Sequence, residues 1–182
     1  MRRILGIVLL LIAVASSPDA FAKSKAPIRI AVTDDLQQVV MARITGAALK
    51  KAGFKIEFVD VAAGEVIEGL SSGDLHAEPR YLLRKDAAYG TALENGSIRR
   101  LGGLSGNRPD DPVQKLVWAG MKKKWPYAQK MLKTMIFPNA ELEALAAQAQ
   151  TDGVDPVVAA WMKDNRKRWK RWVTASTNWM KP

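Results

Sequence analysis

The segment from residue 28 to residue 59 has the pattern of a strand, a helix and a second strand. Residues 28–32 are Ile-Arg-Ile-Ala-Val, a β-branched run typical of a buried strand. Apolar residues then recur at helical spacing as far as Lys50 and Lys51, and residues 54–59 alternate apolar with polar side chains. Such a unit favours two parallel strands joined by a right-handed crossover. The sequence therefore predicts an α/β fold with a parallel sheet flanked by helices.

Shorter elements are predicted to alternate as far as residue 101. Residues 63–72 and 87–95 have helical patterns, whereas 75–83 and 97–101 are typical of strands. Residues 102–112 are rich in glycine and proline and form the clearest linker in the chain. Beyond this linker we expect a helical C-terminal part over 113–182. Its helices are predicted over 113–123, from Pro126 to about residue 135, from Asn139 to Gln150, and from Asp155 to about Val173.

The first 22 residues have the three parts of a secretory signal peptide. Arg2 and Arg3 precede an apolar run over 4–15, and Ala20-Phe21-Ala22 supplies small residues at the cleavage positions. The run is shorter than the roughly 20 apolar residues that span a bilayer, although an uncleaved N-terminal anchor is the alternative. We therefore expect export to the periplasm and a mature domain over 23–182, which holds 160 of the 182 residues.

Composition excludes several catalytic classes. The chain has no cysteine, which rules out a disulfide, a thiolate nucleophile and a cysteine-ligated zinc ion. His76 is the single histidine, so a multi-histidine metal centre is also excluded. Glu78 lies two residues from it on a predicted strand, but no nucleophile motif accompanies the two. We expect no catalytic residue, no metal site and no cofactor, and the chain is not predicted to be an enzyme.

Two carboxylates follow the first predicted strand directly. Asp34 and Asp35 stand where that strand ends and a helix begins. In open α/β sheets, ligands bind outside the carboxyl ends of the strands, so these side chains are expected at the rim of a binding site. The alternative is that they only cap the helix.

The net charge of +10 suggests an anionic partner or surface. On the last predicted helix, Trp161 and Trp172 fall on nearly the same face. The opposite side carries Lys163, Arg166, Lys167 and Lys170. Because an exported protein rarely meets nucleic acid, contact with an anionic membrane surface is the better functional interpretation. The alternative is that the tryptophans pack on the core and the basic side is simply solvated.

Three stretches of the chain have recognisable motifs. The first is 28–59, which includes Ala-Leu-Lys-Lys-Ala-Gly-Phe-Lys-Ile. The second is 64–81, which includes the turn Gly-Leu-Ser-Ser-Gly-Asp, and 93–98 continues it. The third comprises 135–145 and 151–165 and ends with Ala-Ala-Trp-Met-Lys-Asp-Asn. Together they resemble the glycine betaine/choline-type substrate-binding proteins of ABC transporters, and the third stretch is the most specific of the three.

The resemblance implies a lobe like those of type II periplasmic binding proteins and a role in binding a solute for an ABC transporter permease. Family members are typically two-lobed and considerably longer, so this chain resembles one lobe. The family holds a quaternary ammonium ligand in a cage of aromatic rings, where cation–π attraction replaces water. Tyr81 and Tyr89 are the candidate ring donors here, and Asp34 or Asp35 would attract the positive charge.

The sequence departs from the family at two positions of that cage. The aromatic residue usual just after the first strand is replaced by Thr33, Asp34 and Asp35, and Leu82 stands where the family has tryptophan. Ligand binding is therefore expected to be weakened or lost. The alternative function is an envelope interaction module that docks on an anionic membrane or partner surface through its basic C-terminal helix.

Overall fold

The computed structural model describes residues 26–177 except 84–86, 107 and 109, so the predicted signal peptide lies outside the described residues. Five strands form one sheet: β1 (Ile28–Val32), β2 (Ile56–Asp60), β3 (Ala77–Leu82), β4 (Ile98–Gly103) and β5 (Val113–Trp118). The helices are α1 (Leu36–Lys51), α2 (Val66–Ser72), α3 (Ala87–Glu94), α4 (Met121–Lys124), α5 (Pro126–Thr134), α6 (Asn139–Asp152), α7 (Val154–Asp164) and α8 (Arg166–Thr177).

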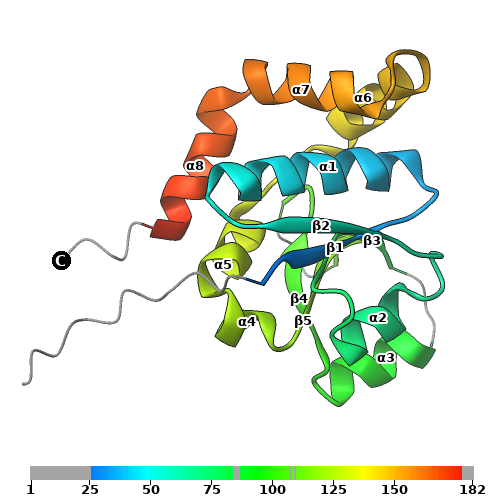
Figure 1. Ribbon diagram of the computed structural model, residues 1–182. Helices are drawn as coiled ribbons and strands as arrows, with labels where there is room; N and C mark the ends of the chain where they lie inside the picture. Colours follow the sequence, from blue (N-terminus) through cyan, green and yellow to red (C-terminus); the bar gives the residue numbers. More distant parts are fainter. Residues whose placement is uncertain (1–25, 84–86, 107, 109, 178–182) are drawn as a thin grey trace, which may run out of the picture.

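The strand order is β2-β1-β3-β5-β4. β1 lies parallel to β2, with Ile28 opposite Ile56, and parallel to β3, with Ile30 opposite Ala77. The predicted strand–helix–strand unit is thus confirmed, because α1 connects two parallel neighbours. β5 runs antiparallel to both β3 and β4. The fold class is the predicted one, a sheet flanked by helices, but one of its inner strands is antiparallel (Figure 1).

The prediction of a helix over 113–123 is wrong for its first half, which forms β5 at the inside of the sheet. Gln114 and Lys115 are polar, yet both are buried. Gln114 Nε2 donates to the Asp111 carbonyl oxygen at 2.6 Å, and Lys115 Nζ donates to the Met135 carbonyl oxygen at 2.6 Å. Because these contacts give an acceptor to each of the two side-chain nitrogens, a strand with every residue but its last buried is stable here.

The segment 102–112, predicted as a linker, is the connection between two hydrogen-bonded strands. β4 continues through Gly103, and β5 begins at Val113. The buried Asp111 organises this connection, since its carboxylate accepts hydrogen bonds from Val113 N at 3.0 Å and from Ser105 Oγ at 2.5 Å. The segment therefore holds the two strands together instead of separating two parts of the chain.

Helices cover both faces of the sheet (Figure 1). α1 and α5–α8 lie on one side, where the larger buried cluster includes Ile30, Met41, Trp125 and Phe137. α2 and α3 lie on the other side, over a smaller cluster that includes Leu70 and Leu116. Among the described residues, none of the helices has the length and apolar character needed to cross a membrane.

The last predicted helix, from Asp155 to Val173, is divided at Asn165 into α7 and α8. Trp161 and Trp172 come from the two separate helices, but their rings still stack, with centroids 5.8 Å apart, and both are buried. Arg168 lies over the Trp161 and Trp172 rings and forms an ion pair with Glu141. The tryptophan side therefore packs on the core, as one of the two interpretations of this segment predicted.

Candidate functional site

A small hollow opens beyond the carboxyl end of β1, alongside the neighbouring strand β3. It has a volume of about 90 Å³, below the roughly 300–1,000 Å³ of typical small-molecule pockets. Because β1 and β3 are parallel, the segment after β1, the start of α1 and the length of β3 come together there. The lining residues are Thr33, Asp34, Asp35, Gln38, Ala63, Val66, Glu78, Arg80, Tyr81 and Leu82.

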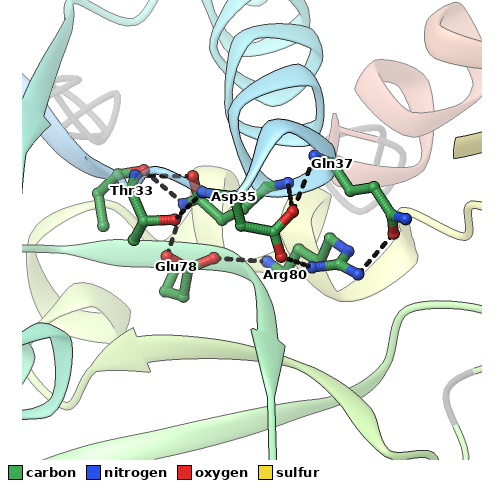
Figure 2. Close-up of polar contacts among 7 residues, drawn as sticks. Thr33, Asp35, Gln37, Glu78 and Arg80 are labelled. Carbon is green, nitrogen blue, oxygen red and sulfur yellow. Dashed lines mark hydrogen bonds and ion pairs between the residues drawn. The ribbon is translucent and has the colours of Figure 1, made fainter. Parts of the chain in front are cut away.

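Asp35 has two roles at the rim of the hollow (Figure 2). Its Oδ1 accepts hydrogen bonds from the backbone nitrogens of Gln37 and Gln38 at 2.9 and 3.3 Å, which caps α1. Its Oδ2 forms an ion pair with Arg80 at 2.5 Å. The predicted capping and the predicted place at the strand end are therefore both present, and the charge of Asp35 is already matched by a cation of the chain itself.

Arg80 is the cation of this site. Its side chain is 11% exposed, and its second guanidinium nitrogen donates to Gln37 Oε1 at 2.6 Å. The guanidinium is thus held against the first turn of α1, facing the rim (Figure 2). A bound solute would meet this positive charge as well as the carboxylates.

Glu78 forms the buried floor of the hollow. Its Oε2 accepts a hydrogen bond from Gln38 Nε2 at 2.7 Å, and its Oε1 accepts one from the Arg80 backbone nitrogen at 2.8 Å. Gln38 is held in turn, because its Nε2 also donates to the Ala31 carbonyl oxygen and its Oε1 accepts from Thr33 N. Burial raises the pKa of Glu78 to about 7, although both hydrogen bonds and the nearby Arg80 charge act in the opposite direction.

The tyrosines predicted as ring donors lie next to each other. Tyr81 lines the hollow and is 7% exposed, and its ring stacks on Tyr89 of α3 with the centroids 5.6 Å apart. Tyr89 is half-buried and supports Tyr81 without lining the hollow itself. Asp34 is exposed at the rim. The structure therefore brings Asp34, Asp35 and Tyr81 to one hollow and places Tyr89 behind it.

Three residues of the hollow, Gln38, Glu78 and Arg80, were missing from the predicted site. Glu78 was considered only together with His76, as an acid/base pair. His76 is held elsewhere, with its ring centroid 4.6 Å from that of Trp125 and 5.6 Å from that of Trp118, and its Nδ1 accepts a hydrogen bond from Arg29 N at 2.9 Å. Burial, together with the charges of Arg29 and Lys124, lowers the pKa of His76 to about 4. No local pattern in the sequence marks Glu78 and Arg80, because their place at the hollow depends on β3 lying beside β1.

The four predicted docking residues lie on two helices that do not line the hollow. Lys163 lies in the last turn of α7 and the other three lie on α8, and all four are exposed: Lys163, Arg166, Lys167 and Lys170. Asp35 caps the start of α1 at the hollow, whereas Lys51, at the end of α1, lines a groove with Lys163 and Arg166. α1 has 16 residues, so at ~1.5 Å per residue the two regions lie about 24 Å apart.

An α/β sheet with polar side chains gathered beyond the end of a parallel strand is typical of a class of protein that binds ligands at this edge. Comparison with protein families identifies the class more closely. The family described as the substrate binding domain of the ABC-type glycine betaine transport system matches residues 26–110 and 103–164. The chain therefore belongs to this family, whose members are extracytoplasmic solute-binding proteins and not enzymes.

Several solved structures of binding proteins have a similar fold. The lactococcal protein OpuAC, in a closed, liganded conformation with glycine betaine, has a TM-score of 0.68 at 12% identity, over 81% of this chain and 99% of that one. The glycine betaine/L-proline-binding protein ProX from Borrelia burgdorferi has a TM-score of 0.68 at 9% identity, over 83% and 100%. A choline-binding protein of an ABC transporter, in complex with choline, has a TM-score of 0.67 at 10% identity, over 81% and 91%.

Proposed function

We propose that this chain is a periplasmic solute-binding protein of an ABC transport system, and that its ligand site is the hollow at the ends of β1 and β3. Membership of the glycine betaine family is the observation that carries the proposal. The position of the hollow supports it, because ligands of open α/β sheets bind at that edge. The chain acts without catalysis and delivers its solute to a membrane permease.

The ligand class we propose is the quaternary ammonium compounds. Tyr81 offers one ring to a trimethylammonium group, and Asp34 is an exposed carboxylate that can balance its charge. A cage of several rings would hold such a group more tightly than one ring does. Asp35 contributes little attraction, since Arg80 already neutralises it. We therefore expect weak, millimolar binding.

The small volume of the hollow fits the proposal of a single lobe. All five strands belong to one sheet, and the segment predicted as a linker joins two of them. A single lobe covers its ligand on one side only, so it cannot exclude water by hinge closure. The permease, or another partner, would supply the second wall.

The hollow carries both carboxylates and the Arg80 guanidinium, so a change of one charge should affect a cationic and a zwitterionic ligand differently. Isothermal titration calorimetry can measure this difference. Choline is a cation, whereas glycine betaine is a zwitterion with a carboxylate. Arg80→Gln is expected to strengthen choline binding severalfold, because Asp35 regains an unbalanced charge, and to weaken glycine betaine binding. Asp34→Asn is expected to weaken both by about fivefold or less.

Glu143→Gln is the matched control for Asp34→Asn, since Glu143 is an exposed carboxylate on α6, away from the hollow. It should bind both ligands as the unaltered chain does. Absence of heat with either ligand at millimolar concentration would remove quaternary ammonium binding from the proposal. Equal changes for both ligands in Arg80→Gln would contradict the placement of the site.

A further inference from the structure

The most strongly charged region of the described chain is not used by the hollow. α8 contains five basic residues and no acidic one. Four of them are exposed, and they continue into basic residues at the ends of α7 and α1. We call this region the basic surface, defined by Lys51, Lys163, Arg166, Lys167, Lys170 and Arg171.

The charges of the basic surface are not neutralised by ion pairs within the described part of the chain. Within the described part of the chain, none of its six side chains lies within ion-pair distance of a carboxylate. The one basic residue of α8 outside the set, Arg168, is the one that forms an ion pair, with Glu141. Asp155 and Asp164 are also exposed nearby, so the region keeps an excess of four positive charges. Such an excess favours an anionic partner.

An apolar groove lies beside these charges. Val158, Met162 and Trp169 line it together with Lys51, Lys163 and Arg166. Trp169 is only partly buried, and its Nε1 donates to the Met162 carbonyl oxygen at 2.8 Å, so the indole is fixed in orientation at the surface. A partly exposed tryptophan among lysines and arginines is the combination that binds the headgroup region of a bilayer.

We propose that the basic surface docks this protein on an anionic phospholipid membrane. Each lysine or arginine near such a membrane strengthens binding by about fivefold, so the surface suffices for reversible attachment. α8 lies near the last residues of α1 (Figure 1), whereas the hollow adjoins the first turn of α1, so it would stay open in the docked protein. Docking would keep a weakly binding protein close to the membrane in which a permease lies.

Vesicle co-sedimentation tests this proposal, with the chain beginning at Lys23, which contains the whole described fold. The apolar run over 4–15 is left out because it would enter neutral and anionic bilayers alike. We expect binding to phosphatidylglycerol/phosphatidylcholine vesicles at low salt, release at high salt, and little binding to phosphatidylcholine alone. The double variant Lys167→Glu/Lys170→Glu should bind at least tenfold more weakly.

The matched control is Lys122→Glu/Lys123→Glu, which changes the net charge equally. Both lysines are exposed on α4, and α5 lies between α4 and α8 (Figure 1). The affinity of this control for anionic vesicles should fall by less than about threefold, because the effect of a charge depends on its distance from the membrane. Equal losses in the two variants, or equal binding to neutral and anionic vesicles, would overturn the proposal. Failure to bind anionic vesicles at low salt would also overturn it and point to an acidic protein instead.

Neither charge variant should change ligand titration at the hollow, because none of the four substituted lysines lines it. A chain that binds vesicles but no quaternary ammonium ligand would refute the proposed function and leave membrane docking intact. A chain that binds a quaternary ammonium ligand but no anionic vesicles would refute membrane docking and leave the proposed function intact.

Discussion

Replacing Glu78 with glutamine is expected to make the protein gain stability as the pH rises from about 4 to about 6.5. In the unaltered protein, burial raises the pKa of Glu78 from 4.5 to about 7, so the folded state binds this proton more tightly than the unfolded chain does. Its stabilising effect is complete below pH 4.5 and is lost as the pH rises through 7. The loss amounts to about 3 kcal/mol over that range.

His76 acts in the opposite direction over nearly the same range. Its pKa is lowered from 6.5 to about 4, so the unfolded chain binds this proton more tightly. Stability therefore rises as the pH increases from about 4 to 6.5, again by about 3 kcal/mol. The two effects nearly cancel in the unaltered protein, which is expected to show a flat profile.

Each single variant uncovers the effect of the other residue. Glu78→Gln leaves the rise due to His76, and His76→Asn leaves the fall due to Glu78. Asparagine retains an acceptor for Arg29 N, and any change in packing shifts the whole curve without altering its slope. Urea unfolding followed by tryptophan fluorescence at several pH values measures the slopes. If the free energy of unfolding changed with pH in the same direction in both variants, the opposite pKa shifts that burial gives Glu78 and His76 would be refuted.

Asp111→Ala is expected to destabilise the protein by about 3 kcal/mol. Its buried carboxylate accepts from Ser105 N, Ser105 Oγ and Val113 N, and removing it leaves the buried amide of Val113 without this acceptor. Those hydrogen bonds also hold the pKa of Asp111 below its usual range, against the effect of burial. Gly103 packs directly against Asp111, because a Cβ at Gly103 would lie 2.4 Å from Asp111 Cβ. Gly103 therefore has no side chain that could fill the space left by the carboxylate.

The neighbouring Asp110 provides the control, because it is exposed. Asp110→Ala should change the free energy of unfolding by less than about 0.5 kcal/mol. Hydrogen exchange should also show that Asp111→Ala releases the amides of β4 and β5 before those of β1 and β2. A similarly small effect of both alanine substitutions would mean that the carboxylate does not organise the connection.

The first half of the fold could be predicted because its signals are local. The β-branched run at 28–32 and the helical spacing after it determine the β1–α1–β2 unit without help from distant residues. β5 could not be predicted in this way. Its polar residues Gln114 and Lys115 are buried only because the carbonyl groups of Asp111 and Met135 accept their hydrogen bonds, and Met135 is distant in sequence.

The same distinction applies to the candidate site. Asp34 and Asp35 could be placed there from the sequence, because a strand end next to a helix start is a local pattern. Arg80 and Glu78 could not, since their roles depend on β3 lying beside β1, and Arg80 pairs with a residue 45 positions away. Tyr81 came from the family resemblance, whereas Tyr89 supports it through a ring contact that only the packing of α3 creates.

NMR chemical-shift mapping of the chain from Lys23 during titration with choline tests the proposed site most directly. We predict shifts at the amides of 33–38, 63–66, 78 and 80–82, in the segments that line the hollow, with α7 and α8 unaffected. Shifts confined to another region, or none at millimolar choline, would contradict the claim that this lobe binds a quaternary ammonium solute at the ends of β1 and β3.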